Sequence, residues 1–415
     1  MHIEIINTGS ELLLGTTLNT HGAWMGSELI QHGFRVQRQT TVPDGPAIME
    51  ALAEAMTRSD VVIVSGGIGP TSDDISREAA AEVLGVDLIE DEAAMRSIEA
   101  FFARRKRPMA EENRKQALNP VGADVLANPN GTAPGVYTPP RLSGDYFCAL
   151  FLLPGPPGEM KPMFHAEVTP RLCALADVSR EHKMQTLRFT GIGESDFHTQ
   201  LDEKLLAIPE LEVGYCARPS EVDLRLIGSR ENIQKAISYT LATFPTHCFS
   251  TKGESLEAVV VNLLTTQGKL LTLAESCTGG RIASRITDVS GASAVFTHGF
   301  VTYANAAKRD LLGVSDDLLE SHGAVSEEVA IAMAEGALKH SNANIAVSVT
   351  GIAGPTGGTQ EKPVGTVWIG LATAEHSFAI HKIHAHGREI FKQSTSQNAL
   401  DLIRRELLKE SGCPS

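Results

Sequence analysis

Along the first third of the chain, the pattern of hydrophobic and polar positions alternates between that of β-strands and that of α-helices. Short apolar runs predict β-strands, and between them apolar residues recur with the spacing of one face of a helix. The predicted strands span residues 3–6, 35–41 and 61–64, and the predicted helices span residues 20–31 and 47–57. Alternation of this kind is typical of a parallel sheet covered by helices. We therefore expect an α/β domain over residues 1–172.

A smaller unit is predicted in the middle of the chain. The polar segment 176–182 predicts a linker before it. The following pattern is strand, helix, strand, strand and helix, at residues 184–189, 195–206, 212–216, 222–228 and 231–241. The turn Gly191–Ser195 resembles the loop of a KH-type domain, but its acidic surroundings argue against RNA binding. We interpret residues 183–250 as a small KH-like α+β unit that serves as a structural connector.

The last part of the chain, residues 253–415, predicts a second α/β domain. Apolar runs at 269–274 and 345–349 predict buried strands, and a glycine-containing turn follows each of them. Thr278–Gly280 opens a predicted amphipathic helix, and another helix is expected from Asn305. The chain is thus predicted to be α/β, with three parts.

Composition limits the classes of function. The chain has 415 residues, which is long for one hydrophobic core, and its formal net charge is −14. This charge argues against nonspecific binding of nucleic acid, whose phosphates require clustered lysine and arginine. The six cysteines form no CxxC pair, so neither a zinc knuckle nor a disulfide framework is predicted. No signal-peptide pattern and no apolar run of membrane-spanning length are found, so we expect a cytoplasmic protein.

The segment 271–308 carries the strongest indication of catalysis. Ser276 lies at the turn between a predicted strand and a predicted helix. Backbone amides at such a turn lack helical partners, so an adjacent hydroxyl lies beside a site for an oxyanion or a phosphate. Gly279 and Gly280 allow a ligand to approach the backbone closely. Ser276 is therefore a candidate nucleophile; the alternative is that its hydroxyl only caps the helix.

A candidate base follows the serine. Tyr303 offers a phenol and Lys308 an amine, and a helix beginning at Asn305 places Lys308 in its first turn. There the positive end of the helix dipole and partial burial disfavour the charged amine, which makes lysine a usable base for serine. Cys277 is an alternative nucleophile, although a cysteine at such a turn more commonly points into the core.

Five motifs in this region resemble the C-terminal domain of the CinA family, the PncC-type nicotinamide mononucleotide deamidases. The motifs are AESCTGG at 274–280, GFVTYAN at 299–305, SHGAVSEEVA at 321–330, VSVTGIAGPTGG at 347–358 and EKPVGTVW at 361–368. The resemblance implies a nucleophile at Ser276, with Lys308 and Tyr303 as its catalytic partners. It also implies hydrolysis of the carboxamide of nicotinamide mononucleotide to the acid and ammonia, without a cofactor, by a homodimer.

Two turns, one asparagine and one arginine are candidates for holding the substrate. The candidate substrate-binding residues are Cys277, Thr278, Gly279, Gly280, Asn305, Gly351, Ile352, Gly354 and Arg388. The amides at 278–280 and the turn at 351–354 are possible phosphate sites, and the amides at 277–279 are a possible oxyanion hole. Arg388 is preferred to Lys392, one helical turn later, because lysine lacks the bidentate geometry of arginine.

The N-terminal domain has a candidate site of its own. The predicted strand 61–64 leads into a glycine-rich turn, the usual ligand crevice of an open α/β sheet. The candidate diphosphate-binding residues are Gly66, Gly67, Gly69, Thr71 and Glu11. Asp73 and Asp74 are candidate ligands of a divalent cation that bridges to the diphosphate. The alternative is that one of these aspartates caps the helix predicted over 75–84.

Three N-terminal motifs resemble the MoaB-like, molybdopterin-binding fold that forms the first half of CinA proteins. They are TGSELLLG at 8–15, GGIGPTSDD at 66–74 and LPGPPGEM at 153–160. The resemblance implies three layers and a metal-dependent ADP-ribose pyrophosphatase. Ser10 stands where the family usually has aspartate, and Asn19-Thr-His21 stands where it has Asp-Thr-Asn. Two carboxylates are thereby absent, and a lower metal affinity is expected.

The combined expectation is a cytoplasmic enzyme of pyridine-nucleotide salvage. Its partners would be small nucleotides, namely nicotinamide mononucleotide and ADP-ribose, rather than nucleic acid or membrane. Deamidation would need no cofactor, whereas the pyrophosphatase would need a divalent metal ion. One alternative is that only the deamidase half is active. Another is a scaffold for competence or recombination proteins, which would need no polar serine, tyrosine and lysine set in a cleft.

Overall fold

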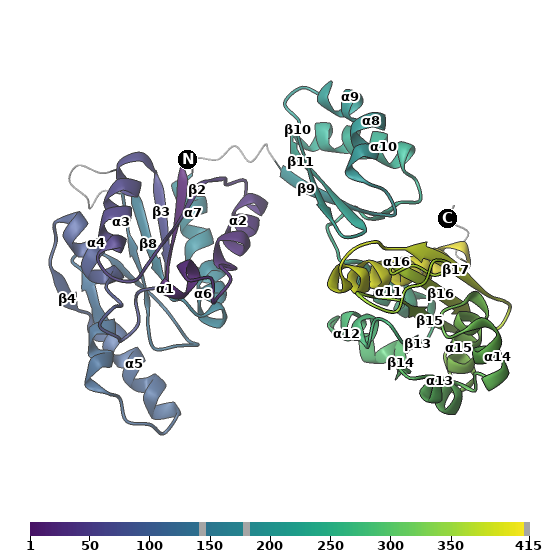
Figure 1. Ribbon diagram of the computed structural model, residues 1–415. Helices are drawn as coiled ribbons and strands as arrows, with labels where there is room; N and C mark the ends of the chain where they lie inside the picture. Colours follow the sequence, from purple (N-terminus) through teal and green to yellow (C-terminus); the bar gives the residue numbers. More distant parts are fainter. Residues whose placement is uncertain (141–146, 177–182, 411–415) are drawn as a thin grey trace. The chain divides into compact units, whose positions relative to one another are not determined.

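The chain forms two compact units, Met1–Lys183 and Met184–Ser415, in a computed structural model that describes residues 1–140, 147–176 and 183–410 (Figure 1). The predicted linker at 176–182 lies outside the described residues except for Ala176. None of the described helices is long and apolar enough to cross a membrane.

The first unit is built on a six-stranded sheet of order β2-β1-β3-β8-β7-β6. Its strands are β1 (Ile3–Thr8), β2 (Val36–Val42), β3 (Val61–Ser65), β6 (Asp124–Leu126), β7 (Gly135–Thr138) and β8 (Ala149–Leu153). The four strands from β2 to β8 run parallel, and β7 pairs antiparallel with both β8 and β6. Every residue of β1, β3 and β8 is buried, as expected of strands covered on both faces.

Helices cover both faces of this sheet, which gives three layers. The helices are α1 (Ser10–Leu13), α2 (His21–Gln31), α3 (Ala47–Arg58), α4 (Ser76–Leu84), α5 (Glu92–Arg104), η1 (Glu111–Ala117), α6 (Pro157–Met163), η2 (Phe164–Val168) and α7 (Thr169–Leu175). One hydrophobic cluster joins α2, α6 and α7 to one face, and a second joins α3 and α4 to the other. The short pair β4 (Leu88–Glu90) and β5 (Leu118–Pro120) lies apart from the main sheet.

The second unit begins with a four-stranded sheet of order β10-β11-β9-β12. Its elements are β9 (Lys183–Thr190), α8 (Glu194–Gln200), α9 (Asp202–Leu206), β10 (Glu212–Arg218), β11 (Glu221–Gly228), α10 (Arg230–Thr243) and β12 (Cys248–Ser250). The single helix predicted over 195–206 is wrong, because Leu201, at φ −130°, separates two short helices. Leu201 and Leu205 bury their side chains in the core around Phe197.

A five-stranded sheet of order β14-β13-β15-β16-β17 forms the rest of the second unit. Its strands are β13 (Leu271–Glu275), β14 (Phe296–Val301), β15 (Ile345–Gly351), β16 (Thr366–Ala372) and β17 (Ser377–Ile383). Its helices are α11 (Leu256–Gln267), α12 (Arg281–Thr287), η3 (Ala292–Ala294), α13 (Asn305–Leu312), α14 (Asp316–His322), α15 (Glu327–Lys339) and α16 (Arg388–Glu410). One cluster packs α11, α12 and α16 on one face, and a second packs α15 on the other.

The parallel strands β13 and β14 place the candidate catalytic residues at one edge of this sheet. In their register Glu275 pairs with Val301, so the residues that follow each strand lie side by side. The Thr302 amide donates to the Glu275 carbonyl over 2.8 Å. Helix α13 then begins at Asn305, as predicted, and brings Lys308 back toward the end of β13.

Candidate active site

The turn after β13 holds Ser276 beneath the surface. Its amide donates to the Val349 carbonyl over 3.0 Å, which ties the turn to β15. The chain then needs left-handed backbone at Gly279 (φ +62°) and Gly280 (φ +92°) to enter α12, a conformation that glycine adopts without strain. Only 8% of Ser276 is exposed.

Lys308 contacts the serine directly. Its Nζ lies 3.1 Å from Ser276 Oγ and donates a second hydrogen bond to the Thr302 carbonyl over 2.9 Å. Only 1% of Lys308 is exposed. Both oxygens are neutral, and burial lowers the pKa of Lys308 below its ordinary value. A buried amine with a lowered pKa beside a hydroxyl is an arrangement in which the amine can act as the base for a serine nucleophile.

Glu275 was not predicted as a site residue, yet its carboxylate organises the turn. Oε2 accepts hydrogen bonds from Thr278 Oγ1 at 2.6 Å and from the Gly280 amide at 3.0 Å. The amides of Ile282 and Ala283 donate to the same carboxylate over 3.1 and 2.8 Å. The sequence did contain a signal for this role, because Glu275 ends a mostly apolar strand a few residues before a predicted helix. A carboxylate buried there needs hydrogen-bond donors, and the free amides at the start of a helix can supply them.

The predicted phosphate cradle at 278–280 is therefore wrong in part. The Gly280 amide is occupied by Glu275, and the Gly279 amide donates to the Ser276 carbonyl over 3.1 Å. The amides of Cys277 and Thr278 donate to no oxygen in the described part of the chain, although both are within hydrogen-bonding range of the Cys277 sulfur. Of the backbone amides at 277–280, these two are the remaining candidates to stabilise an oxyanion.

The structure does not favour Cys277 as the nucleophile in place of Ser276. It is 4% exposed and belongs to the core formed by α11, α12 and α16. Burial raises the pKa of its thiol to about 12, which leaves almost no thiolate at neutral pH.

Tyr303 and Arg388 meet beside the serine turn although 85 positions separate them. The Arg388 guanidinium donates to the Tyr303 hydroxyl over 2.7 Å and to the Gly354 carbonyl over 3.0 Å. Arg388 thus links the tyrosine to the predicted substrate turn. Tyr303 is 60% exposed, so its ring is open to a ligand.

The first half of the turn at 351–354 is already bonded to strand β16. Gly351 pairs with Val367 in the sheet, and the Ile352 amide donates to the Thr366 carbonyl over 2.8 Å. The expectation that this turn cradles a phosphate is therefore wrong for the Ile352 amide, which is already bonded. Asn305 is exposed at the first position of α13.

Buried polar groups gather at the carboxyl edge of the N-terminal sheet. Asn7 and Thr8, at the end of β1, are 1% and 8% exposed, and their side chains have no partner among the described residues. A Cβ at Gly66 would come within 2.4 Å of Thr8 Oγ1, so only glycine allows this approach. His21 Nδ1 lies 2.8 Å from Ser65 Oγ at the end of β3.

The aspartates after this glycine turn do not cap α4. The residue before α4 is Ile75, and among the described residues neither aspartate accepts a hydrogen bond from an amide of the first turn, so the capping alternative is wrong. Asp74 instead accepts from the amide and the hydroxyl of Thr71, and its carboxylate packs against Gly69. Lys115 Nζ donates to the carbonyls of Thr71 and Asp74 over 2.8 and 2.6 Å.

Glu11 and the two aspartates do not converge on one point. Within the described ranges no group of three or more histidine, cysteine, aspartate or glutamate side chains could hold a metal ion. Ser10, at the position where an aspartate was expected, exchanges hydrogen bonds with Asp44 through its amide (2.9 Å) and its hydroxyl (3.3 Å). A divalent cation at Asp73 and Asp74 would therefore depend on phosphate oxygens and water for most of its ligands.

Sequence profiles of three protein families match consecutive parts of the chain. They are "Probable molybdopterin binding domain" over residues 4–174, "Damage-inducible protein CinA KH domain" over 184–242 and "CinA C-terminal domain" over 253–407. These matches agree with the three-layer α/β unit, the four-stranded unit and the five-stranded unit described above.

Two relatives match the chain over nearly its whole length. The chain is 48% identical to the "CinA-like protein" of Akkermansia muciniphila, with 99% of each sequence covered. It is 40% identical to the "CinA-like protein" of Syntrophomonas wolfei, with 97% of this chain and 98% of that protein covered. A crystal structure titled competence/damage inducible protein from Agrobacterium tumefaciens is 43% identical over 36% of this chain and 92% of its own, with a TM-score of 0.36.

Proposed function

The chain belongs to the CinA family, and from this premise we propose that its C-terminal domain hydrolyses the carboxamide of nicotinamide mononucleotide. The observation that carries the proposal is the 3.1 Å contact between Lys308 Nζ and Ser276 Oγ, with both side chains buried. The five sequence motifs shared with nicotinamide mononucleotide deamidases supply the substrate class. The product would be the corresponding acid, with release of ammonia.

The first half of the reaction forms an ester on the serine. Neutral Lys308 takes the proton of Ser276, and Oγ attacks the carboxamide carbon. The negative charge that develops on the carboxamide oxygen is placed next to the amides of Cys277 and Thr278. The C–N bond then breaks, and the Lys308 ammonium returns its proton so that ammonia leaves.

The second half hydrolyses this ester. Lys308, neutral again, takes a proton from water, and the resulting hydroxide attacks the ester carbon. The C–O bond to Ser276 breaks, the acid leaves, and the proton on Lys308 restores the serine hydroxyl. Because Lys308 contacts Ser276 and Tyr303 is bonded to Arg388, we assign the immediate base to Lys308 and substrate positioning to Tyr303.

For the N-terminal domain we propose a separate activity, the metal-dependent hydrolysis of ADP-ribose. Its support is the pair of unpartnered buried side chains, Asn7 and Thr8, beside the close backbone approach at Gly66. Asp73 and Asp74 would share a divalent cation with the diphosphate, and the cation would neutralise its charge. Cation binding should accordingly be weak without nucleotide and stronger with it, which calorimetry with Mg2+ or Mn2+ can measure.

Ammonia release tests the deamidase proposal and separates it from its alternatives. Purified protein is mixed with nicotinamide mononucleotide, with and without EDTA, and ammonia is measured against the acid product. We expect equal amounts of both products and no effect of EDTA. No release under any condition would favour a scaffold for other proteins, and loss with EDTA would exclude the serine–lysine mechanism. We further propose that the protein acts in the cytoplasm as a homodimer, which sedimentation would test.

A further inference from the structure

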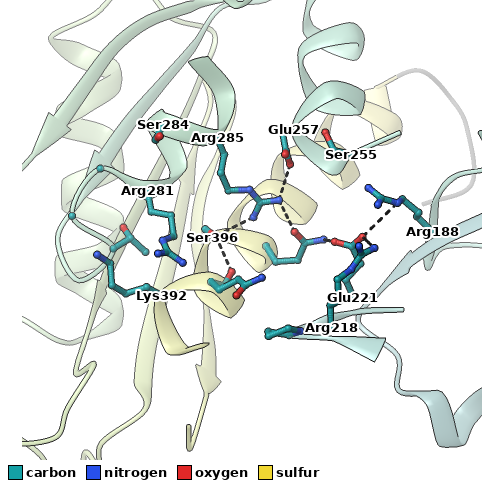
Figure 2. A pocket seen from close by; sticks show the side chains of 16 residues that line it. Arg188, Arg218, Glu221, Ser255, Glu257, Arg281, Ser284, Arg285, Lys392 and Ser396 are labelled. Atoms are coloured by element: carbon teal, nitrogen blue, oxygen red, sulfur yellow. Dashed lines mark hydrogen bonds and ion pairs between the residues drawn. The ribbon is translucent and has the colours of Figure 1, made fainter. Parts of the chain in front are cut away.

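A pocket of about 660 Å3 lies between the small four-stranded unit and α12 and α16 of the C-terminal domain. Figure 2 shows Arg188, Arg218 and Glu221 on one wall, and Arg281, Arg285 and Lys392 on the other. Sites for small molecules commonly enclose about 300–1,000 Å3, so the pocket has room for a nucleotide. The loop 278–280 also borders it, which makes the pocket a neighbour of the serine turn.

The small unit is fixed to this wall by specific contacts. Gln397 of α16 donates to Glu221 of β11 over 3.2 Å, and Arg404 donates to the Thr246 carbonyl over 2.8 Å. The same Gln397 side chain accepts from Arg285 over 2.7 Å. Hydrogen bonds therefore join the two walls of the pocket, the four-stranded unit on one side and helices α12 and α16 on the other.

Most of the arginines in the pocket already have carboxylate partners. Arg218 lies 2.9 Å from Glu221, and Arg285 lies 2.7 Å from Glu257. Arg188 lies 3.4 Å from Asp223. The hydrogen-bonded pairs of Arg218 and Arg285 hold their guanidinium groups in defined directions. Together the pairs cancel much of the charge, so the pocket is unsuited to a nucleic-acid backbone.

Lys392 differs from these arginines. Within the described part of the chain its amine has no hydrogen bond and no ion pair within 4 Å, although its charge helps to lower the pKa of the nearby Glu389. Its Nζ lies 3.8 Å from the position that a Cβ at Gly279 would occupy, so the amine lies close to the loop 278–280. The nearby Arg281 pairs with Glu389, whose side chain is 74% exposed, and such a surface pair is weak enough to open for a ligand.

We propose that Lys392 and Arg281 bind the phosphoryl group of a nucleotide-sized ligand in this pocket. A phosphate dianion offers three acceptor oxygens to an ammonium, a guanidinium and the exposed hydroxyl of Ser284, which also lines the pocket. The start of α12 takes no part, because Glu275 already accepts from its amides. The small unit then completes a ligand site, beyond its predicted role as a connector.

Two sources can supply this phosphoryl group. One is the phosphate of the nicotinamide mononucleotide whose carboxamide meets Ser276, and this assignment rests on the proposed deamidase function. The other is a separate phosphorylated ligand that binds beside the serine turn. Both place the phosphate on the same two cations, and binding experiments distinguish them.

The test uses the full chain with Ser276→Ala, which prevents turnover. Calorimetry measures the binding of inorganic phosphate, pyrophosphate, nicotinamide mononucleotide and nicotinamide riboside. Lys392→Met and Arg281→Gln are compared with Lys339→Met, which removes an exposed lysine at the end of α15 in the same domain. We expect each pocket variant to weaken phosphate and pyrophosphate binding about tenfold or more, and Lys339→Met to leave it unchanged.

The two sources give different patterns. If the substrate supplies the phosphate, the pocket variants weaken the mononucleotide but not the riboside, and phosphate competes with the mononucleotide. If a separate ligand supplies it, mononucleotide affinity is unchanged and phosphate binds simultaneously. Wild-type binding of phosphate and pyrophosphate by both pocket variants, or no binding to the parent protein at millimolar concentration, would overturn the proposal. Because binding is measured without turnover, failure of the deamidase proposal would be seen separately as absent ammonia release.

Discussion

The replacement Lys308→Met isolates the chemical role of the buried amine. Methionine keeps most of the volume of the lysine stem but cannot accept a proton or donate a hydrogen bond. The change removes the 3.1 Å contact with Ser276 and the 2.9 Å bond to the Thr302 carbonyl. Because the site is 1% exposed, water has little access to replace the amine.

A positioned base contributes about a hundredfold to ten-thousandfold to a reaction rate, and we expect a loss of kcat of that size. In the parent enzyme kcat/KM should rise with pH through a pKa below the ordinary lysine value of about 10.4, because burial lowers the pKa of Lys308. This rising limb should be absent from any residual activity of Lys308→Met.

The pH dependence of the free energy of unfolding tests the lowered pKa of Lys308 independently of activity. A lowered pKa in the folded state means that the unfolded chain binds more protons between that pKa and about 10.4, so folding becomes more favourable as pH rises through this window. Lys308→Met lacks this pH-dependent contribution to stability, because methionine does not bind a proton. Its free energy of unfolding relative to the parent should be highest at low pH and decline across the window, as measured by urea denaturation.

The assay measures ammonia release over a range of pH for the parent, Lys308→Met, Lys308→Arg and the surface control Lys339→Met. Arginine keeps a positive charge but cannot act as a base, so Lys308→Arg should lose kcat as Lys308→Met does. An increase in KM alone in Lys308→Met, with activity retained by Lys308→Arg, would make Lys308 a substrate-binding cation and refute its role as base.

Three further predictions concern other residues. Ser276→Ala should abolish deamidation without unfolding the protein, as measured by ammonia release and circular dichroism; activity close to that of the parent would remove Ser276 from the mechanism. Glu275→Gln should lower the free energy of unfolding by about 3 kcal/mol in denaturant titrations, because four donors lose a charged acceptor; an unchanged value would show that the carboxylate does not organise the turn. EDTA or Asp74→Asn should stop ADP-ribose hydrolysis and spare deamidation in one preparation; joint loss of both activities would contradict separate sites.

Local patterns predicted much of the fold because they depend on neighbours in sequence. The apolar run before Glu275 and the helix from Asn305 both lie where the periodicity places them. Helix 195–206 was wrong because the burial of Leu201, a tertiary effect, breaks it. The bond between Arg388 and Tyr303, and the pocket around Lys392, join elements that are distant in sequence, so no local pattern contains them. Likewise, the phosphate cradle failed at Gly280 because the sequence did not reveal that Glu275 turns back onto its amide.

Trapping of the ester on Ser276 tests the central claim most directly. Hydroxylamine added during turnover of nicotinamide mononucleotide should divert the ester to a hydroxamate, which mass spectrometry detects. The account predicts that hydroxamate replaces part of the acid product, that total ammonia release is not reduced, and that Ser276→Ala forms neither product. Ammonia release that yields only the acid at all hydroxylamine concentrations, or that persists in Ser276→Ala, would contradict it.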